Sequence, residues 1–208
     1  MNVAYNMDCL DAMRQMPDNA FDLAVVDPPY RDVSENDAFP QMRKLGKGRT
    51  VFHSGKPTGE YWQELKRVSK EQIIFGANNY GFEFKGFIAW DKCVRGSDRY
   101  SQVEIASLSA GLSTVSTIVQ ATTYIEEDKI HPTQKPVALY SWIFSRYAKP
   151  GDKILDTHLG SGSSRIAAYD AGLDFVGYEI DKEYFEKQEE RFERHTAQMS
   201  LFQKEESE

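Results

Sequence analysis

The sequence predicts an α/β protein built on a largely parallel sheet, with helices on both faces. Short apolar runs rich in β-branched and aromatic residues alternate with helical patterns along the chain. Several of these runs are too apolar to be exposed on either face, which is typical of strands in a parallel sheet. Seven strands are expected on this basis, over residues 3–5, 22–26, 72–75, 87–90, 103–107, 154–156 and 175–178. The length of 208 residues is that of one domain, so we expect a single domain over residues 1–208.

Three helices are expected in the last third of the chain. The first begins after Pro136 and ends before Pro150-Gly151, and its apolar residues recur at helical spacing. The second covers residues 163–170 and is capped by Gly172. The third begins near Asp181 and turns its aromatic residues inward.

Other segments are expected to lie outside the regular elements. Residues 31–59 have no sustained period and are rich in Pro, Gly, Asp and Ser, so we expect an inserted target-recognition loop. Its basic side chains could contact phosphates, and they are Arg31, Arg43, Lys44, Lys47, Arg49 and Lys56. Because Asp32, Glu35 and Asp37 share the segment and Glu60 follows it directly, a solvated loop is the alternative. A second basic loop covers residues 92–99, and a flexible tail is expected over about residues 197–208.

The charge balance argues against a protein coated in basic surface for nucleic acid. The chain has 25 Lys and Arg residues and 32 Asp and Glu residues, which gives a net charge of −7. Residues 181–208 hold five basic and nine acidic residues, so −4 of this charge lies in one terminal segment. The remainder is nearly neutral, and a local basic groove is compatible with it.

The cysteine and histidine content predicts a cytoplasmic protein without a metal site. Cys9 and Cys93 are the only cysteines, and the four histidines show no ligand spacing, so neither a disulfide framework nor a zinc site is expected. The N-terminus lacks the basic region and apolar run of a secretion signal, and no stretch reaches membrane-spanning length. We therefore expect a soluble protein with no membrane contact.

An acid, two prolines and an aromatic ring follow the strand over residues 22–26. Asp27, Pro28, Pro29 and Tyr30 come at its carboxyl end, where open α/β sheets bind their ligands. An exocyclic base amine is a poor nucleophile because its lone pair is delocalised into the ring, and a carboxylate and a fixed carbonyl could accept its two N–H groups. Proline fixes φ, and the tyrosine offers a flat face for a base taken out of its stack. The alternative is a turn that merely ends the strand.

A glycine-rich loop follows the strand over residues 154–156. Gly160 and Gly162 allow backbone N–H groups to approach a ligand just before a helix N-terminus. Glu179 ends the next strand, where an acid can hold two ribose hydroxyls. The alternative is an ordinary dinucleotide fold, although Ala167 and Ala168 lie where its third glycine might be expected.

Together with the segment His131-Pro132-Thr133-Gln134-Lys135-Pro136, these two motifs resemble those of the β-class DNA amino-methyltransferases, in the same order along the chain. The resemblance implies a circularly permuted Rossmann-like sheet, with the N-terminal strand beside the strand that ends at Glu179. It also implies S-adenosylmethionine as the methyl donor and a catalytic role for Asp27, Pro28, Pro29 and Tyr30. The donor site implied by the resemblance consists of Asp8, Asp27, His131, Thr133, Lys135, Asp156, His158, Gly160, Ser161, Gly162 and Glu179.

Two of these donor-site residues have a second interpretation, and the donor loop departs from the family pattern at two positions. Asp8 could equally cap a helix over residues 10–16. His158 stands where the family usually has Phe, and Ser163 where it usually has Thr. An ordinary loop histidine without a catalytic part is the favoured interpretation of His158, because nothing in the sequence provides it with a partner.

The expected function is site-specific methylation of the exocyclic amine of adenine in DNA. Related sequences with Ser at the position of Asp27 more often methylate the cytosine amine, which stays an alternative. A non-catalytic subunit that binds the donor or DNA, and a nicotinamide oxidoreductase, are alternatives from other classes, and methylation of RNA or of a protein glutamine is disfavoured. Because no elaborate recognition domain is visible, we expect either a short target sequence or help from a homodimer partner or a separate recognition subunit.

Overall fold

The computed structural model describes residues 1–30, 55–81, 83–92, 101–112, 117–120 and 129–205, with the backbone alone at residues 117–120 and 199–205. In these residues, eight strands form one sheet in the order β1-β8-β7-β2-β3-β5-β4-β6. The strands are β1 (Asn2–Asn6), β2 (Phe21–Val26), β3 (Ser69–Phe75), β4 (Gly86–Asp91), β5 (Val103–Leu108), β6 (Thr117–Gln120), β7 (Lys153–Asp156) and β8 (Asp174–Glu179). All seven expected strands are therefore confirmed, and β6 is an addition.

The five strands from β1 to β3 in the sheet order run parallel to one another. The other half of the sheet is mixed, because β5 is antiparallel to both β3 and β4, and β6 is parallel to β4. Strand β1 lies beside β8, with Asn6 opposite Glu179. The family resemblance implied this pairing of the N-terminal strand with the strand that ends at Glu179. The carboxyl ends of β1, β8, β7 and β2 consequently share one edge of the sheet.

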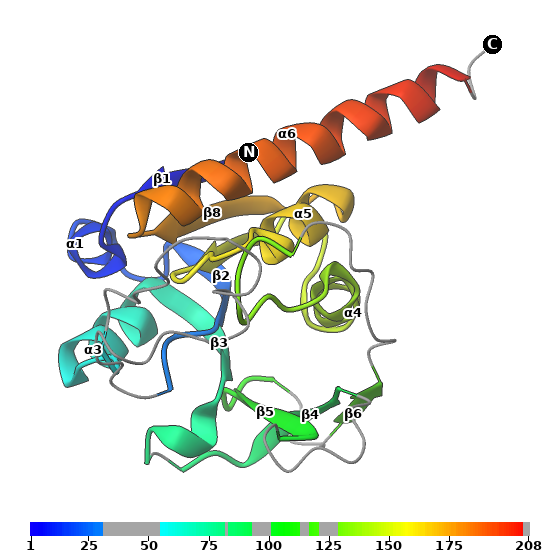
Figure 1. Ribbon diagram of the computed structural model, residues 1–208. Coiled ribbons are helices and arrows are strands. Elements are labelled where there is room, and N and C mark those ends of the chain that lie inside the picture. Colours follow the sequence, from blue (N-terminus) through cyan, green and yellow to red (C-terminus); the bar gives the residue numbers. More distant parts are fainter. Residues whose placement is uncertain (31–54, 82, 93–100, 113–116, 121–128, 206–208) are drawn as a thin grey trace.

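Helices cover both faces of the sheet, as expected (Figure 1). One face carries α1 (Cys9–Met13) and α3 (Gly59–Val68), and the other carries α4 (Val137–Tyr147) and α5 (Ser163–Asp170). A short 3-10 helix, η1 (Ala77–Asn79), follows β3. Each fully buried aliphatic or aromatic side chain in the two cores stabilises the fold by about 1.5–3 kcal/mol.

The expected helices agree closely with α4 and α5, including Pro136 at the start of α4 and a left-handed Gly172 (φ 67°) after α5. Helix α3 was not predicted, although Thr58 caps it and Tyr61, Leu65 and Val68 are its buried residues. It begins at Gly59, inside the segment that the sequence assigned to a loop. Residues 55–58 of that segment belong to no helix or strand, as expected, whereas residues 31–54, and residues 93–99 of the basic loop predicted over 92–99, lie outside the described residues.

Helix α6 (Lys182–Glu205) differs from the expectation at its end. It starts where predicted, with the Asp181 carboxylate accepting hydrogen bonds from the N–H groups of Glu183 and Tyr184. However, it continues to Glu205, so most of the segment expected as a flexible tail is helical. In Figure 1 the helix lies along β1 and β8 and projects beyond the sheet. No helix in the described part of the chain is long and apolar enough to cross a membrane.

Candidate active site

A cavity of about 340 Å³ opens at the carboxyl edge of the parallel half of the sheet. Most of its lining residues come from five segments, which follow β1, β2, β7 and β8 or precede α4, and Glu104 of β5, Tyr140 of α4 and Tyr184 of α6 line it too. Parallel α/β sheets bind their ligands at this edge. Most of the residues expected in the site line this cavity, namely Asp8, Asp27, Pro28, Pro29, Tyr30, His131, Thr133, Lys135, His158, Gly160, Ser161 and Glu179.

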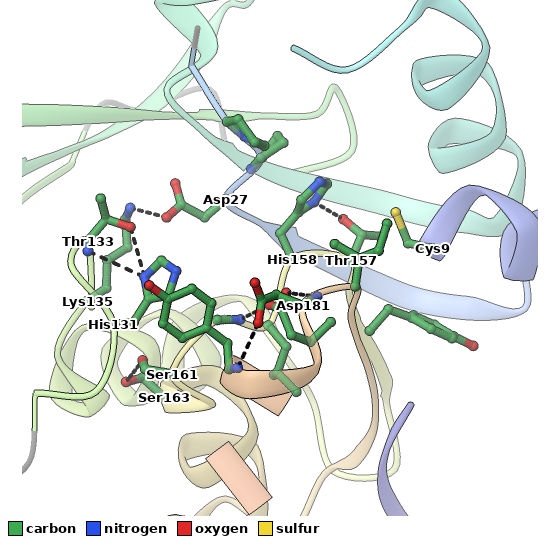
Figure 2. A pocket seen from close by; sticks show the side chains of 18 of the residues that line it. Cys9, Asp27, His131, Thr133, Lys135, Thr157, His158, Ser161, Ser163 and Asp181 are labelled. Atoms are coloured by element: carbon green, nitrogen blue, oxygen red, sulfur yellow. Dashed lines mark hydrogen bonds and ion pairs between the residues drawn. The ribbon is translucent and has the colours of Figure 1, made fainter. Parts of the chain in front are cut away.

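The Asp27 carboxylate is held from two sides. The Tyr30 hydroxyl donates to Asp27 Oδ1 over 2.7 Å, and the Lys135 ammonium donates to Asp27 Oδ2 over 2.5 Å. Figure 2 shows Asp27, at the end of β2, and Lys135, in the loop before α4, pointing toward each other. On the next residue, the Pro28 carbonyl accepts a hydrogen bond of 2.7 Å from the Tyr80 hydroxyl. A carboxylate and a carbonyl on consecutive residues are thus both fixed at the cavity.

Lys135 is a buried cation, with only 4% of its side chain exposed. Besides Asp27, its Nζ atom contacts Glu104 Oε2 at 3.2 Å and lies 4.7 Å from the centre of the Phe75 ring. Burial lowers the pKa of the Lys135 ammonium, but Asp27 and Glu104 outweigh burial and hold that pKa above its usual value. The site therefore keeps a positive charge beside the carboxylate of Asp27 at neutral pH.

Glu104 is a site residue that the sequence analysis missed. It belongs to β5, and it reaches the cavity because β5 pairs with β3, next to β2 in the sheet. Its two oxygens contact different lysines, Oε1 with Lys92 at 2.9 Å and Oε2 with Lys135. The available signal was a single acid in the otherwise uncharged strand Val103–Leu108.

The loop after β7 and the end of β8 form the opposite wall. The Glu179 carboxylate accepts hydrogen bonds from the backbone N–H groups of Gly160 (2.8 Å) and Asp181 (2.9 Å). Gly160 and Gly162 have positive φ values of 53° and 75°, which glycine adopts without strain. Burial raises the pKa of Glu179, partly offset by these backbone donors. The carboxylate is consequently fixed in direction, with acceptor capacity left for hydroxyl groups of a ligand.

Asp156 and Gly162, both expected in the donor site, do not line the cavity. Asp156 lies under the loop, where its carboxylate accepts hydrogen bonds from Ser164 Oγ (2.5 Å) and from the backbone N–H of His158 (3.0 Å). Burial raises its pKa to about 7. Gly162 begins α5 and packs against Gln188, where a Cβ atom would lie 3.1 Å from the side chain. The two residues therefore support the loop from the side that does not line the cavity.

The segment before α4 closes the cavity on a third side. The His131 ring packs edge-on against Tyr184 of α6, with 4.4 Å between ring centres. Its Nδ1 atom lies 3.1 Å from Thr133 Oγ1, and Figure 2 shows this pair. Burial and the nearby lysines lower the pKa of His131 to about 3. A neutral imidazole therefore joins this segment to the C-terminal helix at neutral pH.

His158 has the partner that the sequence could not show. Its Nδ1 atom lies 2.9 Å from Thr157 Oγ1, which is 2.7 Å from the Tyr61 hydroxyl. The imidazole also packs edge-on against the Tyr61 ring, with 5.5 Å between centres. Burial lowers the pKa of His158 to about 4, so this ring is also neutral at pH 7. The histidine that replaces the usual Phe is thus accommodated because the hydroxyl groups of Thr157 and Tyr61 connect it to α3.

Asp8 has the capping role that the sequence offered as one interpretation, and it also lies at the cavity. Its Oδ1 atom accepts a hydrogen bond of 2.7 Å from the backbone N–H of Leu10, so the side chain caps α1. The same residue lines the cavity. The capping geometry fixes the carboxylate at the rim, where its remaining acceptor capacity faces the ligand space.

The cavity is formally acidic. Among the described residues that line it, five carboxylates stand against one ammonium, that of Lys135; the acids are Asp8, Asp27, Glu104, Glu179 and Asp181. This balance favours a ligand with positive charge and disfavours a pyrophosphate. Within the described residues, no group of three or more His, Cys, Asp and Glu side chains is arranged to hold a metal ion.

Comparisons with known sequences find proteins that are described as methylases or methyltransferases. A family model described as DNA methylase matches residues 114–190. The chain is similar to the "Putative methylase YubD" of Escherichia coli (strain K12), with 25% identity over 224 residues that cover 88% of this chain and 87% of that protein. Over 63 residues, which are 30% of this chain and 24% of the relative, it is 41% identical to the type II methyltransferase M2.DpnII of Streptococcus pneumoniae.

Solved structures share the fold. The M1.HpyAVI complex with SAM matches with a TM-score of 0.62 and 21% identity, over 92% of this chain and 98% of that one. The PvuII DNA methyltransferase, described as cytosine-N4-specific, matches with a TM-score of 0.59 and 12% identity, over 95% of this chain and 91% of that one. Together with the pairing of β1 and β8, these matches confirm the Rossmann-like sheet that the sequence predicted.

The position of Asp156 predicts a pH-dependent stability. The pKa of its carboxyl is about 7 in the folded protein, against an ordinary value of 3.8, so the folded state binds more protons than the unfolded state between these values. The contribution of this carboxyl to stability is therefore lost as the pH rises from about 4 to about 7. The Asp156→Asn variant lacks this titration. In urea denaturation at several pH values in this window, the free energy of unfolding of the variant, relative to that of the wild type, should increase as the pH rises.

The exposed Glu193 offers a matched control, because Glu193→Gln removes a carboxylate from the surface of α6. Its difference from the wild type should stay constant between the same pH values. A constant difference for Asp156→Asn as well would contradict the conclusion that burial raises the pKa of this carboxyl in the folded protein.

Proposed function

We propose that this chain is an S-adenosylmethionine-dependent DNA amino-methyltransferase, as its similarity to known methylases supports, and that it methylates the exocyclic amine of adenine. The observation that carries the proposal is the pair of acceptors at the end of β2, the Asp27 carboxylate and the Pro28 carbonyl. Both belong to the cavity that also holds Glu179 and the glycine loop. An acid at position 27, where Ser is more frequent in enzymes that act on cytosine, supports adenine.

The cavity residues fit the donor. S-adenosylmethionine is a cation with a ribose, and the acidic cavity suits its charge. The Glu179 carboxylate, held by two backbone N–H groups, would accept hydrogen bonds from the ribose hydroxyls. When bound, S-adenosylmethionine supplies a methyl group that is electrophilic because it is attached to a positively charged sulfur.

The chain's own residues would prepare the amine. Asp27 would accept one N–H of the amine and the Pro28 carbonyl the other, which localises the nitrogen lone pair toward the methyl group. Because both acceptors are fixed before the base arrives, little reorganisation is needed during the reaction. The amine nitrogen loses a proton when it is methylated, and the Asp27 carboxylate is the base placed to receive it.

The acidic cavity also bears on the alternatives. A nicotinamide dinucleotide would bring its pyrophosphate next to the carboxylates of Glu179 and Asp181, which is unfavourable. A non-catalytic subunit would not require both acceptors of the amine to be fixed. Methylation of the cytosine amine uses the same two acceptors and is the second candidate, and a solved neighbour described as cytosine-N4-specific supports it.

For target recognition, we propose that residues 31–59 contact the DNA. A second copy of the chain or a separate subunit would supply the remaining contacts that recognise the target sequence. Residues 31–54 lie outside the described residues, so this proposal rests on their basic composition and on their place directly after Asp27–Tyr30. Sedimentation of the chain with duplex DNA measures the stoichiometry. A complex of one chain that binds one long, defined site tightly would contradict the need for a second subunit.

Removal of the Asp27 carboxylate tests the catalytic assignment. Asp27→Ala should reduce transfer of labelled methyl groups to unmethylated mixed-sequence DNA by at least about a hundredfold, because an acceptor of the reacting amine is lost. Calorimetric titration should show that S-adenosylmethionine binding changes little. Circular dichroism controls for folding, and full turnover by a folded variant would exclude Asp27 from the chemistry.

Glu179 provides a separate test of donor binding. Glu179→Gln should weaken S-adenosylmethionine binding by about tenfold or more, because it replaces charge-assisted hydrogen bonds with neutral ones. The matched control is Glu190→Gln, which neutralises an exposed residue of α6 and should leave the dissociation constant unchanged. Equal binding by both variants would argue against contact between Glu179 and the donor.

A further inference from the structure

The chain's own side chains occupy both oxygens of Asp27. Tyr30 OH donates to Oδ1 and Lys135 Nζ to Oδ2. In the proposed function, the same carboxylate must accept an N–H group of the target amine. Each carboxylate oxygen can still accept a second hydrogen bond, but an acceptor that serves several donors binds each of them less strongly. Binding of the amine is therefore strongest if at least one of these two contacts loosens when the base enters.

The two groups on Asp27 cannot simply be released. The Lys135 side chain is almost completely buried, and burial is also the largest cause of a pKa of the Tyr30 hydroxyl well above its usual range. The Tyr30 ring is fixed against Gly76, where a Cβ atom would fall within 2.1 Å of it. A buried donor left without an acceptor costs about 1–3 kcal/mol, and more if it is charged. A second acceptor is needed within reach of both.

Glu104 is that acceptor. Its Oε2 atom lies 3.3 Å from Tyr30 OH and 3.2 Å from Lys135 Nζ, so the two groups lie between two carboxylates. Its Oε1 atom is paired with Lys92 at 2.9 Å, which holds the side chain in place from the outside. Only a small movement brings the Tyr30 hydroxyl from Asp27 to Glu104.

The charge of Glu104 suits this role. Burial raises the pKa of its carboxyl, but the ammonium groups of Lys135 and Lys92 outweigh burial and bring the pKa below its usual value. Glu104 is thus ionised at neutral pH and accepts hydrogen bonds on both oxygens. Asp27, Glu104, Lys135 and Lys92 together carry no net charge, so the cluster stays balanced when a neutral base enters.

We propose that Glu104 is a positioning residue that takes over the Tyr30 hydroxyl, and a larger share of the Lys135 ammonium, when the target amine binds to Asp27. The proposal rests on the proposed function for its purpose, but the exchange of partners is a property of the chain alone. Glu104 itself touches neither the donor nor the base in this account. It provides a hydrogen-bond acceptor for Tyr30 and Lys135 both before and after the target base binds.

The first test needs no substrate. In a crystal structure of Asp27→Ala, which removes the first acceptor, Tyr30 OH should move into a normal hydrogen bond with Glu104 Oε2, and Lys135 should remain paired with the same oxygen. Either donor left without a protein acceptor, or turned away from Glu104, would overturn the proposal.

The second test is a double-mutant cycle on the folding equilibrium. If Glu104 replaces Asp27, Glu104→Gln should cost much more in the Asp27→Ala background than in the wild type, by about tenfold in the equilibrium constant. Failure of the double variant to fold, while both single variants fold, is the extreme form of this result. Glu64→Gln, which removes an ion-paired carboxylate of α3 outside the cavity, should be additive with Asp27→Ala. Additivity for Glu104 as well would contradict the exchange.

The third test connects the exchange with turnover. Glu104→Gln should lower kcat/KM for DNA by about tenfold, change the dissociation constant of S-adenosylmethionine much less than this, and move the alkaline limb of activity to lower pH. The shift follows because the pKa of Lys135 is held up by Asp27 and Glu104 together. Unchanged kcat/KM with an unmoved limb would overturn the role in the reaction. If the wild type itself methylates no DNA, the proposed function fails, and the crystal structure and the cycle still decide the exchange.

Discussion

The ammonium of Lys135 is the group on which the catalytic side of the site depends. A buried charge must be paired to be tolerated, and Lys135 meets this requirement through Asp27 and Glu104. These three residues come from the end of β2, from β5 and from the loop before α4. The pairing therefore fixes three distant segments against one another around the carboxylate of Asp27, which is the proposed acceptor of the target amine. The rings of Phe75, Tyr30 and Trp90 surround the same ammonium within 6 Å and exclude water from it.

The donor side depends on the neighbouring strands β1 and β8. Their parallel pairing places Asn6 opposite Glu179, so the segment that begins with Met7 and Asp8 lies beside the segment that follows Glu179. Residues near the start of the chain and residues near its end thus build one wall. The backbone N–H groups of Gly160 and Asp181 then fix the carboxylate of Glu179 in that wall. Asp27, the proposed catalytic acid, and Glu179, the proposed acceptor of the ribose hydroxyls, are in this way held by unrelated interactions, which is why substitutions at these two residues are expected to separate turnover from donor binding.

What the sequence predicted depended on local signals and on motif order. The apolar strands, the positive φ of Gly172 and the start of α4 after Pro136 are set by residues next to one another, and all are present. Of the residues expected in the cavity, Asp8, Asp27 and Glu179 lie there because they end or follow strands at one edge, whereas Lys135 reaches it from the loop before α4. Glu104 and the chain Tyr61–Thr157–His158 were out of reach, since tertiary pairing between distant elements creates them. Asp156 was assigned to the ligand, whereas burial and its bond to Ser164 place it behind the loop.

The measurement that tests the account most directly is identification of the methylated nucleoside. The wild-type chain is incubated with S-adenosylmethionine carrying a labelled methyl group and with unmethylated mixed-sequence DNA, and the digested DNA is separated into nucleosides. If the chain methylates adenine as proposed, the label is found in N6-methyladenine. Label in N4-methylcytosine would contradict the choice of base while keeping the chemistry of Asp27 and Pro28. Absence of label from DNA, with S-adenosylmethionine bound, would contradict the account and support a non-catalytic subunit.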